Sequence, residues 1–318
     1  MSTTNNSTML EVQKLNKRFG EVQAVKDLSF EIKKGEVFGF LGPNGAGKTT
    51  TMRILTCFIP PTSGTIKIDN LDTLEGSLQI RKKIGYLPEN TPLYNDMLVD
   101  EYLTFVGSLR GFSGHALSAA KENMYKVCSL TNMKRRQIGK LSKGYRQRVG
   151  LAQAMIHNPD MLILDEPMSG LDPNQIIEIR ELIKNIGKEK TVIYCSHILS
   201  EVSATCSRIL IINDGMSVAT GTADELTSKS GKGNLYKLKV KGEKDSIITR
   251  LKEVPNVTTA TSLSEVTDKW VHVTVNADGK SDIGEELFRC VVDNGWSLAE
   301  LKHEETSLED VFTKLTRG

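Results

Sequence analysis

No stretch of this chain of 318 residues is apolar for long enough to cross a lipid bilayer. The longest apolar runs lie at residues 37–41 and 209–212. Both are far shorter than the roughly 20 residues that a membrane-spanning helix needs. Any role at a membrane would therefore require a separate protein that spans it.

The sequence also lacks paired cysteines. Its five cysteines, at positions 57, 128, 195, 206 and 290, are odd in number and never form a C-x-x-C arrangement. We expect reduced, mostly buried thiols, which are typical of a cytosolic protein. Residues 1–8 are polar and lack the basic start and apolar core of a signal peptide, so we expect no secretion.

A strong charge of either sign is absent. The 41 Lys and Arg against 39 Asp and Glu leave a net charge of +2, so charge gives no reason to expect a nucleic-acid partner. We also find no internal repeat and no low-complexity segment. The length predicts about two domains, and 39% hydrophobic with 25% charged residues is typical of globular proteins.

The most specific motif present is the glycine-rich segment GPNGAGKT at residues 42–49, which matches the whole G-x-x-x-x-G-K-[ST] pattern. A predicted strand at residues 36–41 precedes it and a helical stretch at residues 50–55 follows it, which is the context of a phosphate-binding loop. Its glycines allow the backbone to wrap phosphates, Lys48 supplies positive charge, and the Thr49 hydroxyl can bind Mg²⁺. An ordinary glycine-rich turn is the alternative, and the complete match in this context disfavours it.

Two adjacent acids, Asp165 and Glu166, follow the apolar run at residues 161–164. A buried strand that ends in carboxylates is expected beside a metal–phosphate site. There, Asp165 would hold Mg²⁺ through water, and Glu166 would orient or polarise the attacking water. An acidic pair alone fits a solvated turn equally well, so the catalytic interpretation depends on the phosphate loop.

Two helix starts flank this strand. Ser142 can cap a helix that also contains Gly144, and the backbone N–H groups at such a start can meet an anion. Asp172 is a second predicted N-cap, with Pro173 at the first helical position and Gly187 at the end of the helix.

The pattern of the first 228 residues predicts an α/β fold. Alternation at residues 10–15 and 24–32 indicates a small antiparallel sheet. Residues 98–140 are helix-like and indicate a helical insertion, at about residues 98–157, into a nucleotide-binding core. The dipeptide Asp214-Gly215 between two apolar segments predicts a hairpin.

A linker predicted at residues 229–234 separates a first domain, residues 9–228, from a second, residues 235–318. The second domain has four predicted strands and three predicted helices. The strands lie at residues 235–240, two within 256–276, and 296–303, and the helices at 244–254, 281–294 and 307–315. The order βαββαβ plus a helix indicates a small ferredoxin-like α+β domain.

Together, these motifs resemble those of the ATP-binding cassette (ABC) ATPases over about residues 9–225. The segment LSKGY at residues 141–145 resembles the family signature, and Ser169-Gly170-Leu171-Asp172 resembles the loop that links the two sites of an ABC dimer. A lone histidine after a strand is more often structural. However, His197, in Tyr-Cys-Ser-His past the acidic pair, matches the histidine that contacts the γ-phosphate in this family.

The resemblance implies a P-loop NTPase core with an antiparallel β subdomain and a helical insertion, and it implies a set of site residues. Lys48, Glu166 and His197 would serve catalysis, and Mg²⁺ would be held by Thr49, Glu89 and Asp165. ATP would be bound by Phe19, Gly42, Pro43, Asn44, Gly45, Ala46, Gly47, Lys48, Thr49, Thr50, Ser142, Gly144 and Asp172.

The chain departs from the family pattern at three of these motif positions. Lys143 and Tyr145 stand in the signature where the family has glycine and glutamine. Glu89 stands where the family has a glutamine that senses Mg²⁺ and the membrane partner, and the alternative for this segment is a surface turn after a strand. Phe19 lies where the family stacks an aromatic ring on adenine.

The function implied is that of the ATP-binding and ATP-hydrolysing subunit of an ABC transporter. Two copies, or this chain and a second ABC ATPase, would pair head to tail around two ATP. The pair would power an integral membrane permease from the cytoplasmic face of the membrane. The tail TSLEDVF at residues 306–312 resembles type-2 exporter ATPases of drug, sodium and gliding-motility systems, which implies export. A purely stabilising or dimerising domain is the open alternative for this tail.

Two other functions are compatible with an ABC-type sequence. A ribosome-acting or DNA-acting ATPase is disfavoured because those relatives carry two cassettes or long coiled coils, whereas this chain has one compact cassette. A binding module without turnover is disfavoured by the presence of Lys48, Asp165 and Glu166.

Overall fold

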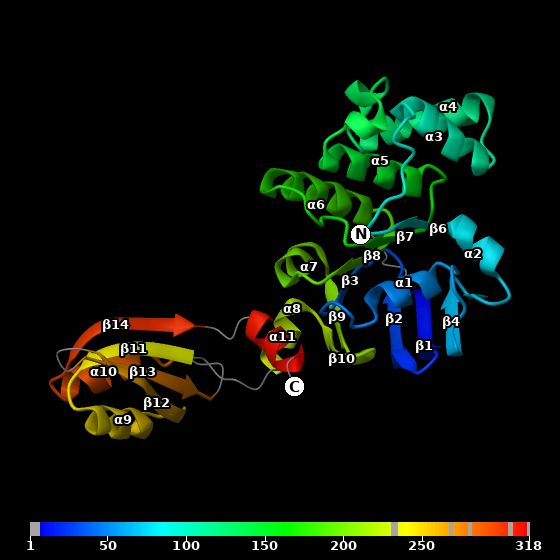
Figure 1. Ribbon diagram of the computed structural model, residues 1–318. Helices are drawn as coiled ribbons and strands as arrows, with labels where there is room; N and C mark the ends of the chain where they lie inside the picture. The colour runs from blue at the N-terminus through cyan, green and yellow to red at the C-terminus, as the bar shows by residue number, and fades with distance from the viewer. Residues whose placement is uncertain (1–6, 230–234, 267–269, 279–281, 305–307, 317–318) are drawn as a thin grey trace. The chain divides into compact units, whose positions relative to one another are not determined.

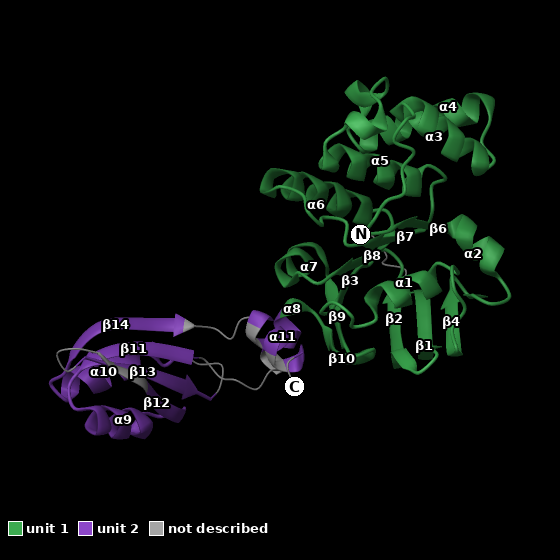
Figure 2. Ribbon diagram, viewed as in Figure 1, with its two compact units in different colours: residues 1–223 green, residues 224–318 purple. Residues whose placement is uncertain are grey.

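The structure is a computed structural model that describes residues 7–229, 235–266, 270–278, 282–304 and 308–316. The chain divides into two compact units, residues 1–223 and residues 224–318 (Figure 2). The first unit has two sheets and the second has one, and each unit has a hydrophobic core of its own.

The first unit contains a four-stranded antiparallel sheet with the strand order β2-β1-β4-β5 (Figure 1). Its strands are β1 (Thr8–Phe19), β2 (Val22–Lys33), β4 (Ser63–Ile68) and β5 (Leu71–Asp72). The alternating segments at residues 10–15 and 24–32 lie inside β1 and β2, so the antiparallel sheet predicted from them is confirmed.

A second sheet of six strands has the order β10-β9-β3-β8-β7-β6. Its strands are β3 (Val37–Leu41), β6 (Ile84–Leu87), β7 (Met161–Asp165), β8 (Thr191–Ser196), β9 (Arg208–Asn213) and β10 (Met216–Gly221). All neighbouring strands are parallel except β10, which pairs antiparallel with β9. Every residue of β7 and β8 is buried, as expected for parallel strands that are covered on both faces.

Helices cover both faces of this parallel sheet. The helix α1 (Lys48–Leu55) packs between the two sheets, where its Met52, Ile54 and Leu55 join side chains of both sheets in one core. The other face is covered by α6 (Pro173–Gly187) and α7 (Leu199–Thr205), which contact β8 and, for α7, also β3. The predicted α/β architecture is therefore confirmed.

The helical insertion predicted at about residues 98–157 is present. It consists of α3 (Val99–Leu109), α4 (Gly114–Val127), η1 (Thr131–Met133), η2 (Ile138–Lys140) and α5 (Lys143–Met155). The helices α3, α4 and α5 pack on one another, and α5 also contacts β6. The insertion is thereby joined to the parallel sheet.

Local sequence signals explain where α6 begins and ends. The Gln175 backbone N–H donates to Asp172 Oδ1 at 3.0 Å, and Pro173 occupies the first turn, as predicted. The helix ends at Gly187, the predicted end, and packing also requires glycine there, because a Cβ on Gly187 would lie 2.3 Å from Val37 Cγ2.

The predicted hairpin at Asp214-Gly215 is also present. Both residues adopt positive φ, at 48° and 78°, as a two-residue turn between β9 and β10 requires.

The second unit is a four-stranded antiparallel sheet with helices on one face. Its elements are α8 (Ala223–Lys229), β11 (Leu235–Lys241), α9 (Lys244–Glu253), β12 (Val257–Val266), β13 (Trp270–Ala277), α10 (Gly284–Asp293), β14 (Ser297–Glu304) and α11 (Leu308–Thr316). The strand order β12-β13-β11-β14 with βαββαβ connectivity is the split βαβ arrangement of the predicted ferredoxin-like domain. Residues 230–234 of the predicted linker, and residues 281 and 307 at the starts of two predicted helices, lie outside the described residues.

Three short helices, α2 (Ser77–Lys83), α7 and α8, have no counterpart among the predicted elements. Each has seven residues, which is too short for a helical period to stand out in the sequence.

All five cysteines are free thiols, of which Cys128 and Cys195 are buried and the other three are partly buried. Within the part of the chain that the structure describes, no helix is both long and apolar enough to cross a membrane.

Candidate functional site

The predicted site residues follow the carboxyl ends of four parallel strands. In the sheet register, Leu41 of β3 lies beside Ser196 of β8, and Asp165 of β7 lies beside Cys195. The next strand, β6, ends at Leu87, two residues before Glu89. Because the strands are parallel, the loops after them open on the same edge of the sheet, where open α/β sheets bind their ligands.

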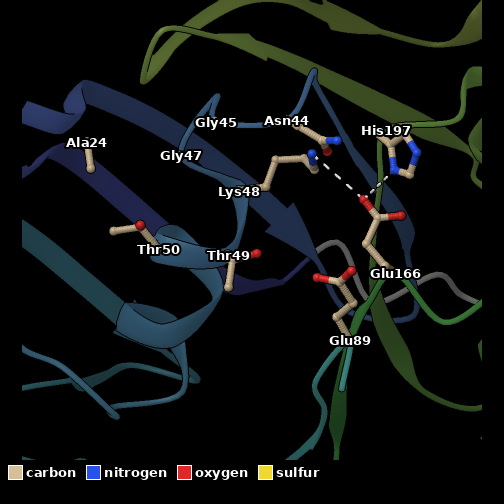
Figure 3. Close-up of a pocket in the computed structure, with 10 residues that line it drawn as sticks. All are labelled: Ala24, Asn44, Gly45, Gly47, Lys48, Thr49, Thr50, Glu89, Glu166 and His197. Atoms are coloured by element: carbon tan, nitrogen blue, oxygen red, sulfur yellow. Dashed lines mark hydrogen bonds and ion pairs between the residues drawn. The ribbon is translucent and has the colours of Figure 1, made fainter. Parts of the chain in front are cut away.

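A pocket of about 350 Å³ lies at this edge (Figure 3). Of the predicted residues, it brings together six from the glycine-rich loop and its helix and three from the other strand ends. These are Asn44, Gly45, Gly47, Lys48, Thr49, Thr50, Glu89, Glu166 and His197, together with Ala24 of β2.

The glycine-rich loop passes close to the backbone of other strands. A Cβ on Gly47 would lie 2.4 Å from Ala24 O, and Gly47 has φ 95°, so only glycine fits there without strain. A Cβ on Gly42 would lie 2.5 Å from Ile212 O. The loop leads directly into the N-terminus of α1. The unpaired N–H groups and the dipole at this helix start favour a phosphate.

Lys48 is 6% exposed and directs its ammonium back over the loop. Its Nζ donates to Gly42 O at 2.9 Å and to Pro43 O at 3.2 Å, and it lies 3.7 Å from Glu166 Oε1. Gly42 and Pro43 thus hold Lys48 through their carbonyl groups, while the Ala46 N–H closes the loop onto Pro43 O at 3.2 Å.

Glu166 is the residue on which the polar groups of the pocket converge. It is 7% exposed, and its backbone has φ 49°, a left-handed conformation that is uncommon for a residue with a side chain. Its Oε1 lies 2.9 Å from His197 Nδ1, and its Oε2 lies 3.2 Å from Ser196 Oγ, within hydrogen-bond distance. Figure 3 shows Lys48 and His197 directed at the same carboxylate. Such strain at a buried carboxylate is typical of functional positions.

Asp165 supplies oxygen atoms that are suited to a metal ion. Both of its carboxylate oxygens are buried and form no hydrogen bond of normal geometry with any described residue. Burial raises the pKa of Asp165, and the charges of Glu166 and Glu89 raise it further, while the nearby Cys195 thiol and Thr49 hydroxyl lower it. Unpartnered carboxylate oxygens beside a threonine hydroxyl fit Mg²⁺, which prefers oxygen ligands and takes most of them from phosphate and water.

Glu89 lies at the rim of the same pocket and is exposed, with its carboxylate directed inward in Figure 3. Among the described residues there is no cluster of three or more His, Cys, Asp or Glu side chains that could hold a metal by itself.

Seven predicted ATP-binding residues do not line this pocket. Three of them, Gly42, Pro43 and Ala46, belong to the phosphate loop, and the other four lie elsewhere in the chain. Phe19 ends β1 with half of its surface exposed, and Lys17 Nζ lies 5.0 Å from the centre of its ring. Ser142, Gly144 and Asp172 belong to helix starts outside the pocket.

The structure brings the LSKGY segment and the Ser169–Asp172 loop together. Ser142 caps α5 by accepting the Tyr145 N–H at 3.4 Å, and a Cβ on Gly144 would lie 2.7 Å from the Gln175 side chain. A Cβ on Gly170 would lie 2.2 Å from Lys143 Nζ, so the lysine side chain crosses the loop at that glycine. These two segments form one surface, separate from the pocket of the same chain.

Sequence reasoning missed several residues that support the site. Ala24 lines the pocket, and its carbonyl oxygen is the atom that requires glycine at position 47. Ser196 and Glu201 form a buried hydrogen-bonded group behind Glu166. Ser196 is the residue before His197, whereas no sequence signal pointed to Glu201.

A family model for ABC transporters matches residues 25–169. The linearmycin resistance ATP-binding protein LnrL of Bacillus subtilis is 33% identical over 315 residues, which cover 97% of this chain and 98% of that protein. The chain belongs to the ABC transporter ATP-binding proteins. It is an ATP-binding subunit of an ABC transporter and an ATP hydrolase.

Other relatives of this family match the chain over different lengths. The bacitracin transport ATP-binding protein BcrA of Bacillus licheniformis is 33% identical over 316 residues and covers 98% of both chains. The ABC transporter ATP-binding protein NatA of Bacillus subtilis is 37% identical over 224 residues, which cover 69% of this chain and 91% of that protein.

Solved ABC structures match about two thirds of the chain. The dimeric structure of MJ0796, a bacterial ABC transporter cassette, has a TM-score of 0.62 and 27% identity, and the match covers 67% of this chain and 98% of that one. A second structure of MJ0796, with the same scores, is a dimeric post-hydrolysis state bound to ADP and Pi.

Proposed function

We propose that this chain works as one half of a dimer that closes around two ATP molecules. Each ATP would be held between the phosphate loop of one copy and the Ser142 region of the other. The observation that carries the proposal is that Ser142 and Gly144 stand at a helix start outside the pocket formed by Lys48, Glu166 and His197. The free N–H groups of that helix start suit an anion that the same chain does not supply.

Within each site, the residues divide the work of hydrolysis. Lys48 and the loop N–H groups bind the phosphates, Phe19 stacks on adenine, and Asp172 supports the neighbouring loop. Glu166 orients the attacking water, and His197, which contacts Glu166 at 2.9 Å, stabilises the γ-phosphate during transfer. Mg²⁺ would neutralise the phosphate charge when bound, with Thr49 and Asp165 as its protein ligands and Glu89 as a further oxygen donor.

We propose a separate membrane permease as the partner that the ATPase drives from the cytoplasmic face of the membrane. Two exposed apolar side chains, Leu78 on α2 and Leu109 at the end of α3, support this assignment; each is 60% exposed or more. The Arg110 guanidinium donates to Arg81 O at 2.9 Å, which joins the end of α3 to α2. Exposed apolar side chains on neighbouring elements are found at protein interfaces.

We propose export as the direction of transport. LnrL and BcrA, whose names refer to resistance and to bacitracin transport, match nearly the whole of this chain, including its second unit. The second unit, residues 235–318 in the predicted boundaries, would act as a regulatory or interaction domain. The exposed side chains of Phe288 and Val292, one turn apart on α10, support a role in contacts.

The dimer is tested with Glu166→Gln, which retains the shape of the side chain but orients water poorly. We expect Mg-ATP to convert this variant from monomer to dimer in size-exclusion chromatography, with ATP turnover lowered at least about hundredfold. Glu178→Gln is the matched control, because Glu178 pairs with Arg148 on the surface, and it should turn over ATP like the unchanged protein. A Glu166→Gln protein that remains monomeric at saturating Mg-ATP would contradict the proposed dimer.

A further inference from the structure

A buried hydrogen-bonded group lies behind Glu166, on the side away from the phosphate loop residues that line the pocket. It contains Tyr194 and Ser196 of β8 and Glu201 of α7, which are 0%, 0% and 5% exposed. Tyr194 OH donates to Glu201 Oε2 at 3.0 Å. Ser196 Oγ lies 3.0 Å from the same oxygen and 3.2 Å from Glu166 Oε2. One serine hydroxyl therefore stands between two buried carboxyl groups.

The Ser196 hydroxyl has a single proton, so it can donate to only one of these carboxyl groups at a time. Its oxygen already accepts the Ile198 backbone N–H at 3.1 Å, which fixes the position of that oxygen. The direction of the O–H bond is therefore the remaining freedom, and it points either to Glu166 or to Glu201.

The two oxygens of Glu166 differ in how they are held. Oε1 is within reach of His197 at 2.9 Å and Lys48 at 3.7 Å. Among the described residues, Oε2 has Ser196 as its only hydrogen-bond partner. The direction of the Ser196 proton thus decides whether Oε2 is engaged by the chain or is available to accept a proton from water.

Glu201 competes for this proton. A buried carboxylate is costly unless donors satisfy it, and the donors of the Glu201 side chain are the hydroxyls of Tyr194 and Ser196. If Ser196 turned to Glu166, Glu201 would keep one donor instead of two. The buried position of Glu201 therefore favours the orientation that leaves Glu166 Oε2 free.

We propose that Glu201 is a positioning residue for ATP hydrolysis, which holds the Ser196 proton and thereby leaves Glu166 Oε2 free to accept from the attacking water. This inference rests on the proposed role of Glu166. Glu201 would act only through Ser196, without contact with ATP, and Tyr194 would share the hydrogen bonding of Glu201 with Ser196.

The test is steady-state Mg-ATP hydrolysis by the full chain with Glu201→Gln, Ser196→Ala and the double variant. An amide oxygen accepts more weakly than a carboxylate, so in Glu201→Gln the Ser196 proton should shift to Glu166. We expect kcat about tenfold lower and a KM for ATP changed less than about twofold, since no nucleotide contact is lost. When Ser196 is already replaced by Ala, adding Glu201→Gln should change kcat less than about twofold. When Ser196 is replaced by Thr, which keeps a hydroxyl, Glu201→Gln should again lower kcat.

If the Glu201 charge instead acted on Glu166 directly through space, Glu201→Gln would still lower kcat after the Ser196 hydroxyl is removed. A Glu201→Gln effect of full size in the Ser196→Ala background would therefore overturn the proposal, as would an unchanged kcat in Glu201→Gln alone. If Glu166→Gln itself retains hydrolysis, the role of Glu166 is wrong and the inference falls with it. If Glu166→Gln abolishes hydrolysis while Glu201→Gln does not lower it, only the inference is wrong.

A second variant is expected not to lower kcat, and this test does not depend on whether Glu201→Gln folds. Tyr194→Phe removes one of the two donors to Glu201, so Glu201 should hold the Ser196 proton more firmly and kcat should equal or exceed that of the unchanged protein. Tyr125→Phe is the matched control, because the Tyr125 hydroxyl donates to Asp100 in the helical insertion, away from Ser196. A tenfold loss of kcat in Tyr194→Phe, with Tyr125→Phe unaffected, would contradict the proposed direction of the proton.

Discussion

The ammonium of Lys48 lies 3.7 Å from Glu166 Oε1 while it donates to two carbonyl oxygens of its own loop. The cation that would bind phosphate is thus in direct electrostatic contact with the carboxylate that would orient water. Both side chains are less than a tenth exposed, so water screens this contact weakly. A phosphate bound at the loop would compete with Glu166 for Lys48. Nucleotide binding would therefore release the Glu166 carboxylate from its contact with Lys48.

Lys48→Ala should weaken ATP binding by at least roughly a hundredfold, or about 2.7 kcal/mol, because a buried charge-assisted contact to phosphate is lost. Isothermal titration calorimetry with ATP measures the change in Kd. Lys34→Ala is the control, since Lys34 pairs with Asp69 at the surface, and its Kd should not change. Equal affinity of Lys48→Ala and the unchanged protein would remove the phosphate-loop assignment.

Glu89→Gln tests the metal site. If Glu89 contributes an oxygen ligand, the variant should need several-fold more Mg²⁺ for half-maximal ATP hydrolysis, and Asp165→Asn should need more still. Glu75→Gln, an exposed acid outside the pocket, serves as the control. An unchanged Mg²⁺ dependence in Glu89→Gln, together with a changed one in Asp165→Asn, would place Glu89 outside the metal site.

His157 predicts a loss of stability in mild acid. Its Nε2–H donates to Ile84 O at 3.0 Å, its Nδ1 is buried without a partner among the described residues, and burial with the nearby Arg110 lowers its pKa from 6.5 to about 4. The folded state thus binds this proton more weakly than the unfolded state. The contribution of neutral His157 to the free energy of unfolding should be complete above pH 6.5. It should be lost as the pH falls towards 4, by an amount on the order of 1–3 kcal/mol.

Urea unfolding at pH 7 and pH 5 measures this pH dependence. His157→Gln keeps a donor for Ile84 O but cannot take up a proton, so it should reduce the drop in stability between the two pH values. His115→Gln, at an exposed position on α4, should leave the drop unchanged. Identical drops in both variants would show that His157 is not its source.

Leu78→Glu tests whether the exposed apolar residues of α2 and the end of α3 form the permease contact. We expect the variant to hydrolyse ATP in solution like the unchanged protein but to lose a membrane protein that co-purifies with the chain from detergent extracts. The control is Met216→Glu, an exposed apolar residue on the edge strand β10. Retention of the same membrane protein by Leu78→Glu would place the contact elsewhere, and repeated recovery of ribosomes would favour a different class of partner.

Much of the fold could be predicted from local patterns. The glycine-rich loop between a strand and a helix, the capped start of α6 and the Asp214-Gly215 turn were each specified by residues close in sequence. The helices α2, α7 and α8 could not be predicted in the same way, because seven residues do not establish a helical period. Gly187 shows a related limit, since its requirement for glycine comes from Val37, a residue 150 positions away in the chain.

The sequence by itself predicted which residues would carry phosphate, metal and water chemistry, because the glycine-rich loop and the acidic pair require particular residue types at fixed spacing. Only the tertiary structure decided how these residues meet. The parallel order of β3, β8, β7 and β6 brings four strand ends to one edge, and it sets His197, Lys48 and Ser196 around the strained carboxylate of Glu166. It also placed Glu201 behind that carboxylate, because hydrogen bonds between residues on separate elements depend on packing, which no local pattern records.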